Sequence, residues 1–288
     1  MSKFILFVDS ACDINAQLLK EWNVESCELS LTFSDSNREY SDRELDAGEF
    51  YNKMREGATP KTSAANMGKF YDAFEPLLSA GNDILYLGFS SGLSATYNFA
   101  CEAANELKAT YPDRKIITVD SLCASAGYGL LVYFAAEMQK NGASIEEVAA
   151  FCEETKLKIC HWFTVEDLKY LKAGGRISPT TALVGTMLGI KPVMRVDDNG
   201  KLVSFIKVRG RRASLEEIAK QYGESAVDKK DGTVFISHGD CLEDANYLAK
   251  LLGDIYGATV KVITNVGPVI GSHSGPGTMA LFFVGKSR

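Results

Sequence analysis

The chain has 288 residues, of which 46% are hydrophobic and 24% charged, and it contains only 7 prolines. This composition excludes disordered, collagen-like and membrane-spanning classes. The longest apolar runs, such as residues 4–8 and 279–284, are far shorter than the roughly 20 residues that a bilayer helix needs. The apolar run near the first residue is also too short for a secretory signal, so we expect a cytoplasmic protein.

The length predicts two domains, at roughly 100 to 200 residues per domain. Residues 1–160 carry 14 Lys and Arg against 24 Asp and Glu, whereas residues 161–288 carry 17 against 13. We therefore divide the chain into domains 1–160 and 161–288 with surfaces of opposite sign. Different binding partners would explain this asymmetry, and so would solubility and docking between the domains.

The seven cysteines include no Cys-x-x-Cys pair. An odd number without paired spacing fits neither a disulfide framework nor a zinc ribbon. The three histidines, His161, His238 and His273, are dispersed along the chain. The sequence therefore predicts no metal site and no cofactor.

The first 160 residues alternate short apolar runs with longer helical patterns. Strands are predicted at residues 4–8, 28–33, 84–89 and 115–119, and helices at 13–22 (with Asp13 as the N-cap), 95–109 and 124–141. Ser144 and Glu147 form a capping box that opens a further helix to about residue 156. Such alternation is typical of an α/β domain in which helices flank a mostly parallel sheet.

The pattern changes after residue 160. Residues 191–196 and 202–208 are extended runs joined by Asp-Asp-Asn-Gly, which indicates a hairpin because Asn-Gly tolerates the positive dihedral angles of tight turns. A strand, a helix and a strand follow at about residues 233–237, 242–256 and 259–266, and a last strand at 279–284. We expect a C-terminal α+β domain packed closely on the first, because no low-complexity linker separates them.

One catalytic motif is present. Gly88-Phe89-Ser90-Ser91-Gly92 matches the nucleophile elbow of serine hydrolases and lies between a predicted strand and helix. His238 and His273 follow it in the order that a triad requires. The alternative is a tight Ser/Gly turn without catalysis, since no HGGG-like oxyanion segment precedes it. Hydrolysis of acyl esters through Ser90 and a histidine stays open as an alternative function.

Hydroxyl residues stand at predicted helix starts: Thr62 and Ser63 before one helix, and Ser94 before another. The first turn of a helix offers unpaired N–H groups and a partial positive charge, so it can hold a carboxylate or phosphate. Ordinary N-capping explains the same residues without any ligand.

Several motifs together resemble the DegV family, over essentially the whole chain and in the right order. They are Asp9-Ser-Ala-Cys-Asp13, Lys61-Thr-Ser63, Ser90-Ser-Gly-Leu-Ser-Ala-Thr-Tyr97, Asp120-Ser121, Leu171-Lys-Ala-Gly-Gly-Arg-Ile-Ser178, Lys191-Pro192 and His273-Ser-Gly-Pro-Gly277. The Gly-Gly-Arg-Ile-Ser and His-x-Gly-Pro-Gly elements are the most specific. The family is similar to the fatty-acid-binding subunits of bacterial fatty acid kinase.

The resemblance implies a function. A long-chain fatty acid would lie in a cleft between an N-terminal α/β domain and a C-terminal α+β domain, and its carboxylate would be presented to a separate ATP-binding kinase. The protein would then be no enzyme alone and would bind no nucleic acid, which also suits its pI of about 5.3. Peripheral membrane contact for acyl exchange and a monomer or weak dimer are further expectations.

The resemblance also implies roles for particular residues. The carboxylate would be held by Thr62, with Ser63 beside it, and by Ser94. The backbone at Ala95 would assist, and Arg176 would stabilise the site. Arg209 and His273 would lie near the head group, where kinase-coupled members need them for phosphoryl transfer. The chain departs from the family where the usual Thr-Ser-Gln-Pro is Thr62-Ser-Ala-Ala65 and the usual Leu-Ser-Gly-Thr is Leu93-Ser-Ala-Thr96.

Two further segments have alternative interpretations. Residues 182–190 are apolar, uncharged and rich in small side chains, so they suit either a tunnel for the acyl tail or ordinary core. Lys207, Arg209, Arg211 and Arg212 form a basic cluster that would serve as a docking patch or a phosphate contact, or would be a solvated face.

Overall fold

The structure of the protein, a computed structural model, describes residues 4–36, 38–177 and 189–288. The described strands form three sheets of four, six and three strands. None of the described helices is both long enough and apolar enough to cross a bilayer.

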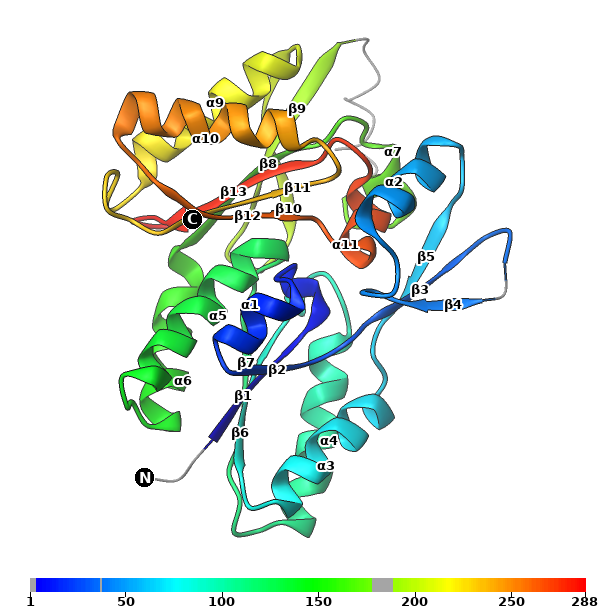
Figure 1. Ribbon diagram of the computed structural model, residues 1–288, viewed down its shortest axis with the longest axis vertical. Coiled ribbons are helices and arrows are strands. Elements are labelled where there is room, and N and C mark those ends of the chain that lie inside the picture. Colours follow the sequence, from blue (N-terminus) through cyan, green and yellow to red (C-terminus); the bar gives the residue numbers. More distant parts are fainter. Residues whose placement is uncertain (1–3, 37, 178–188) are drawn as a thin grey trace.

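The four-stranded sheet belongs to the first part of the chain, and all its strands are parallel. In spatial order the strands are β2 (Val24–Cys27), β1 (Phe4–Asp9), β6 (Asp83–Gly88) and β7 (Ile116–Asp120). The helices of this part of the chain are α1 (Ala16–Glu21), α3 (Met67–Ser79), α4 (Thr96–Thr110), α5 (Ser125–Lys140) and α6 (Ile145–Thr155). Helices α5 and α6 lie on one side of the sheet and α3 and α4 on the other (Figure 1). Strands β1 and β6 are therefore buried on both faces, as expected for a parallel sheet. The predicted α/β fold is confirmed.

The six-stranded sheet is mixed. In spatial order its strands are β10 (Leu202–Arg209), β9 (Ile190–Val196), β8 (Ile159–Thr164), β13 (Met279–Val284), β11 (Val234–His238) and β12 (Val260–Asn265). Strands β11 and β12 are parallel, and the other neighbours are antiparallel. Helices α9 (Arg211–Ser225) and α10 (Leu242–Tyr256) pack on this sheet. The β9–β10 pair confirms the predicted hairpin, while the division at residue 160, which falls within β8, stays a prediction.

Helix α5 fills the space between the two large sheets. It contacts β1 as well as β8, β11 and β13, and most of its residues are buried all round, as is typical of an internal helix. The approach is close at Gly127, where any side chain would collide with His161 and Phe282. The start of α5 is thereby held against the six-stranded sheet.

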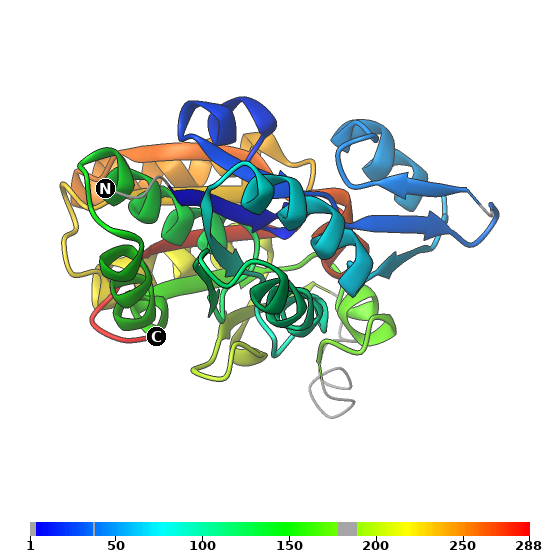
Figure 2. The same cartoon turned by 90° about the horizontal axis from the view of Figure 1, so that it is seen from below.

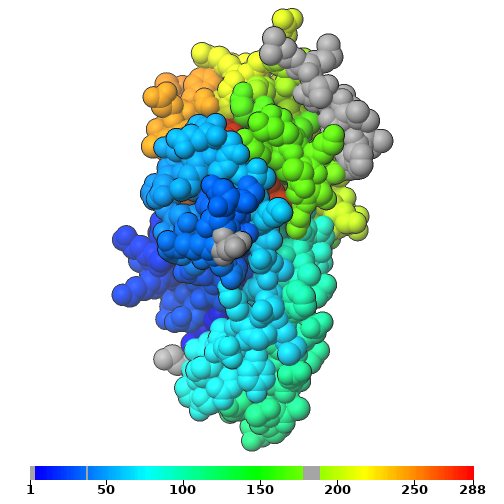
Figure 3. Space-filling model, turned by 90° about the vertical axis from the view of Figure 1, so that its right-hand side faces the viewer, coloured from blue at the N-terminus to red at the C-terminus, as the bar shows by residue number. Residues whose placement is uncertain are grey.

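A small antiparallel sheet was not predicted as a separate unit. Its strands are β4 (Glu39–Ser41), β3 (Ser30–Phe33) and β5 (Pro60–Ser63), accompanied by α2 (Ala47–Arg55). Figure 2 shows this unit projecting at the end of the molecule opposite α5 and α6. It packs against α11 (Pro268–Ser274), which also contacts α7 (Lys169–Ala173). In Figure 3 the blue atoms of this unit lie beside the green segment that carries α7.

The predicted cap of the first helix was wrong. Asn15 caps α1 by accepting from Leu18 N at 2.9 Å, whereas Asp13 has a left-handed backbone (φ 52°). The Asp13 carboxylate instead accepts from Ser125 Oγ and from Gly267 N, both far away in the sequence. The predicted capping box of α6, formed by Ser144 and Glu147, is confirmed.

Candidate ligand-binding site

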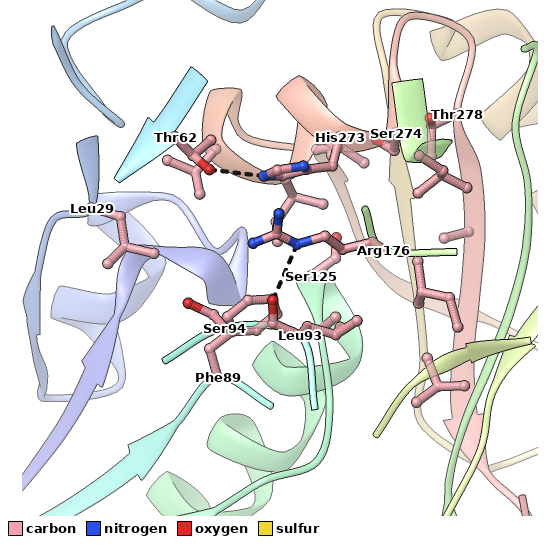
Figure 4. A pocket seen from close by; sticks show the side chains of 18 of the residues that line it. Leu29, Thr62, Phe89, Leu93, Ser94, Ser125, Arg176, His273, Ser274 and Thr278 are labelled. Carbon is pink, nitrogen blue, oxygen red and sulfur yellow. Dashed lines mark hydrogen bonds between the residues drawn. The ribbon is translucent and has the colours of Figure 1, made fainter. Parts of the chain in front are cut away.

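A cavity of about 280 Å³ lies where the three sheets meet. Much of its lining is apolar and comes from segments far apart in the sequence: Leu29, Phe89, Leu93, Phe163, Leu202, Val269, Ile270 and Phe282. Polar side chains gather on part of the wall, around Arg176 (Figure 4). A cavity that is mostly apolar with a few convergent polar groups is suited to a ligand with a long apolar body and a polar head.

Six of the predicted site residues line this cavity. They are Thr62, Ser63, Ser94, Ala95, Arg176 and His273. They come from β5, from the turn before α4, from the segment after α7, and from α11. The fold therefore brings together residues that are up to 211 positions apart.

Thr62 is not at a helix start, which corrects the prediction made from the pattern. It lies in β5, where it is paired with Leu31 of β3, and α3 begins only at Met67 with Asn66 as its cap. The Thr62 hydroxyl lies 2.8 Å from Nε2 of His273 (Figure 4). The hydroxyl is thus aimed into the cavity by a strand.

Ser94 does stand at a helix start, as predicted. Its Oγ accepts from Thr96 N at 3.2 Å and lies 2.9 Å from Thr96 Oγ1. Ala95, the cap position of α4, has no side-chain capping bond. Thr96 N is therefore already taken by Ser94 Oγ, whereas Ala95 N has no hydrogen-bond acceptor among the described residues and is an available donor at the cavity wall.

Arg176 brings a positive charge to the cavity. Its Nε donates to Leu93 O at 3.2 Å, and its Nη1 donates to Gly174 O. No carboxylate of the described residues lies within ion-pair distance of it. Burial lowers the pKa of Arg176, but a guanidinium stays charged in proteins. A partly buried cation of this kind is stabilised by an anion beside it.

His273 lies in the last turn of α11, although glycines stand at positions 271 and 275 on either side of it. Burial, and secondly the charge of Arg176, lower the pKa of His273 to about 4, so the ring is neutral at pH 7. Nδ1 is buried without a hydrogen-bond partner among the described residues and faces Gly174, where a side chain would collide with it. A buried N–H without an acceptor is costly, so we place the proton on Nε2. Nε2 then donates to Thr62 Oγ1, which leaves the Thr62 O–H free to donate to a ligand.

One predicted site residue lies elsewhere, and one predicted segment is largely not described. Arg209 is exposed at the end of β10, next to Ile190 of β9, and does not line the cavity. The hairpin directs this end of β10 to the edge of the six-stranded sheet. Of the proposed tunnel segment, residues 182–188 lie outside the described residues.

Ser90, the candidate nucleophile, is fully buried and does not line the cavity. Its Oγ donates to Gly200 O at 2.9 Å and accepts from Gly92 N at 3.2 Å, and none of its hydrogen bonds to described residues involves a histidine. Gly92 and Gly200 leave room for the turn between β9 and β10, because a side chain at either position would collide with the other segment. The motif therefore joins the two large parts of the molecule, and the geometry gives the hydrolase alternative no support.

Several lining residues were missed from the sequence. His161 and Phe163 on β8, Ser125 at the start of α5, and Ser237 on β11 all line the cavity. Ser125 Oγ lies 2.9 Å from Ser237 Oγ and also donates to Asp13. No local pattern distinguishes these residues from ordinary core, because only the packing of α5 on the six-stranded sheet brings them together.

Comparison with known proteins decides the family. The model of an uncharacterised protein family, DegV, matches residues 3–286. The chain belongs to the DegV family. A DegV domain-containing protein of Clostridium perfringens is 45% identical to this DegV chain over 291 residues, which cover 100% of this chain and 99% of the relative. The resemblance found from the motifs is confirmed.

Solved DegV structures share the whole fold. A DegV family protein from Thermus thermophilus, described by its fatty acid binding, has a TM-score of 0.88 at 29% identity and covers 98% of this chain and 99% of its own. A stearic-acid-binding protein from Eubacterium ventriosum has a TM-score of 0.89 at 25% identity, with 98% of each chain covered. Members of the family thus bind fatty acids in structures that match this one throughout.

Proposed function

We propose that this protein binds one long-chain fatty acid, with its carboxylate beside Arg176 and its tail along the apolar wall of the cavity. The observation that carries the proposal is a charged guanidinium, without a carboxylate partner among the described residues, on the wall of an otherwise largely apolar cavity. The fatty-acid ligands of DegV relatives from Thermus thermophilus and Eubacterium ventriosum support it.

The head group would be held by three kinds of donor. The hydroxyls of Thr62 and Ser94 donate to the two carboxylate oxygens, and the backbone N–H of Ala95 contributes a further donor at the start of α4. Arg176 supplies the compensating charge, and hydrogen bonds to a charged acceptor are roughly twice as strong as neutral ones. Neutral His273 donates to Thr62 rather than to the ligand, and Ser63 borders the head group.

The tail would supply most of the affinity. Burying about 14 methylenes at about 0.8 kcal/mol each contributes on the order of 11 kcal/mol before the cost of association. A single charge-assisted hydrogen bond contributes about 1.5–3 kcal/mol. The head-group residues therefore decide mainly which end of the acid enters and how it is oriented.

We further propose that the bound acid is presented to a separate ATP-binding kinase subunit, which converts the carboxylate to an acyl phosphate. The basis is the resemblance to the fatty-acid-binding subunits of fatty acid kinase, in which the carrier alone is not catalytic. The test incubates the loaded protein with ATP and a purified kinase subunit, and traps acyl phosphate with hydroxylamine. Hydroxamate that forms only when both proteins are present supports the proposal, and its absence overturns this part.

Binding itself is tested by native mass spectrometry of protein purified without added ligand. The expected spectrum shows one additional mass that equals a C14 to C20 fatty acid and disappears on denaturation. The same measurement on the double variant Thr62→Ala/Ser94→Ala should show mostly unloaded protein. Full retention of the acid by the double variant would contradict the carboxylate assignment, and a bound mass that is no carboxylic acid would contradict the ligand class.

A further inference from the structure

Two buried aspartates from the first part of the chain hold the beginning of α11. Asp13 Oδ1 accepts from Gly267 N at 3.0 Å, and Asp42 Oδ1 accepts from Val269 N at 2.8 Å. The residue between these two donors is Pro268, which has no N–H. The carboxylates therefore take up the two backbone N–H groups that the chain offers at this point.

Neighbouring contacts fix the same point. Tyr51, also buried, donates from its hydroxyl to Val266 O at 2.8 Å, and Thr264 Oγ1 donates to Asp13 O at 2.9 Å. A Cβ on Gly267 would lie 2.8 Å from Asp13 Oδ1, so a side chain here would displace either this carboxylate or the start of α11. The start of α11 is thus attached to the first part of the chain through both the C=O and the N–H of the Val266–Gly267 peptide.

Helix α11 links this attachment to the ligand cavity. His273 follows Val269 by four residues, which is about 6 Å along a helix. A short helix moves as one body, so a shift at Val269 reaches His273 and changes its hydrogen bond to Thr62.

We propose that Asp13 and Asp42 are positioning residues of the head-group site, which hold α11 so that His273 keeps the Thr62 hydroxyl aimed at the ligand. The proposal rests on the proposed binding of a fatty acid carboxylate at Thr62. Neither aspartate lines the cavity: Asp42 acts through α11, and Asp13 acts through α11 and through Ser125, which lines the cavity. Loss of either contact is expected to weaken ligand binding although no cavity-lining side chain is replaced.

The charges around Asp42 allow this role to be separated from a purely structural one. Asp42 faces the Ser10 hydroxyl and Val269 N, with the charges of Arg43 and Glu28 nearby, and its charge is also felt by Asp13 and Tyr51. Burial is the main cause that raises the pKa of Asp42 to about 6. Burial likewise raises the pKa of Asp13.

The sign of the stability effect follows from this raised pKa. An unfolded aspartate titrates near 3.9, so between about pH 4 and pH 6 the folded state holds more protons at this residue than the unfolded state. The contribution of Asp42 to stability is therefore largest at low pH and is lost as pH rises through 6. The hydrogen bond from Val269 N to Asp42, by contrast, becomes stronger as pH rises through 6, because the ionised carboxylate is the stronger acceptor.

The experiment compares Asp42→Asn with wild type in fatty-acid affinity and urea unfolding, at pH 7.5 and pH 5. At pH 7.5 we expect affinity to fall about three- to tenfold while stability is unchanged or higher, because a buried charge has been removed. At pH 5 wild-type Asp42 is mostly protonated, so the affinity ratio should approach 1. A ratio that stays the same at both pH values, or a loss of affinity that merely follows a loss of stability, overturns the proposal.

Two further variants guard against misfolding and unspecific effects. Gly267→Ala keeps both carboxylates but forces the start of α11 away from Asp13, and should weaken binding to a similar extent. The matched control is Asp83→Asn, a buried aspartate that accepts from Lys115 N at 3.0 Å at the opposite end of β6 from Phe89. Its affinity should stay within about twofold of wild type, since β6 separates it from the cavity by about 17 Å.

A double-mutant cycle tests whether Asp42 acts through the histidine. In a His273→Gln background, Asp42→Asn should cost little further affinity, because the contact that it positions is already lost. Fully additive losses would overturn the route through α11. Failure of the wild-type protein to bind any fatty acid would instead refute the proposed function, so the two failures are distinguishable.

Discussion

At the scale of single residues, the site depends on a pair that local sequence could not reveal. Thr62 and His273 are 211 positions apart, yet their side chains are joined by a 2.8 Å hydrogen bond. The imidazole is neutral at pH 7 because burial and the charge of Arg176 lower its pKa to about 4. A neutral ring holds the Thr62 hydroxyl without adding a second charge, so in the proposed complex Arg176 alone would balance the ligand carboxylate.

Removal of the Thr62 hydroxyl tests this arrangement. Thr62→Val keeps a β-branched side chain that suits strand β5 but removes the donor, and fatty-acid affinity should fall roughly ten- to hundredfold. Isothermal titration with a soluble fatty acid measures the change. The matched control is Thr32→Val in the neighbouring strand β3, whose side chain faces the opposite side of the small sheet because Thr62 pairs with Leu31. Equal losses in both variants would contradict a role for the Thr62 hydroxyl.

Ser90 provides a second prediction for a single residue. Ser90→Ala removes the donor to Gly200 O and should lower the free energy of unfolding by about 1–3 kcal/mol, because the carbonyl loses a buried partner. Fatty-acid affinity should remain near that of wild type, and neither protein should react with a fluorophosphonate. Labelling of wild type that Ser90→Ala abolishes would favour the hydrolase alternative instead.

At the scale of elements, α7 and α11 meet at a glycine. Gly174 has an ordinary helical backbone (φ −74°) and is needed only because the His273 ring lies against it. The Gly-Gly-Arg motif thus gives room to the histidine and then directs Arg176 into the cavity. The Gly-Gly-Arg motif and the His273 motif, almost 100 residues apart in the sequence, therefore pack against each other at the cavity.

Gly174→Ala should therefore weaken binding by displacing His273, although alanine is the better helix former. We expect an affinity loss similar to that of His273→Ala, with no further loss when the two changes are combined. Gly253→Ala in α10 is the matched control, since a Cβ there meets only Ala258 O at an ordinary 3.6 Å. Normal affinity in Gly174→Ala would show that the contact between the two elements is not needed.

At the scale of the whole molecule, the cavity is shared by all three sheets. Leu29 precedes β3 of the small sheet, Phe89 follows β6, and Phe282 lies on β13 of the six-stranded sheet. A ligand in this position contacts parts of the chain that otherwise meet at α5, at the Ser90 turn and at the start of α11. Ligand binding and the stability of the fold are therefore coupled.

A bound fatty acid should stabilise the entire protein. At a free concentration 100 times Kd, the gain is about 2.7 kcal/mol, which corresponds to a rise in Tm of roughly 5–10 °C. Differential scanning calorimetry measures it. The methyl ester of the same acid, which has no anionic head, should give a clearly smaller shift, and Thr62→Val/Ser94→Ala should reduce the shift with the free acid. Equal shifts for acid and ester would contradict recognition of the carboxylate.

Much of the fold was predictable because its signals are local. The helix at Leu242–Tyr256 and the strand at Met279–Val284 have the predicted bounds, and the hairpin around Asn199 and Gly200 follows from its turn residues. Strand β3 lies within the strand predicted at residues 28–33, but the small sheet was missed because its other two strands, β4 and β5, have only three and four residues. Thr62 was assigned to a helix start for the same reason: a short strand followed by a helix resembles an N-cap.

The sequence by itself determined the alternation of strands and helices, and its motifs named six residues that line one cavity. Only the tertiary structure decided that His273 is helical and neutral, that Ser90 is a contact between two segments, and that Asp13 and Asp42 hold α11. The physical reason is that turns, caps and periodicity are properties of consecutive residues, whereas a cavity wall, a collision or a shifted pKa arises from burial by distant segments. The candidate binding site of this protein depends on such burial by distant segments.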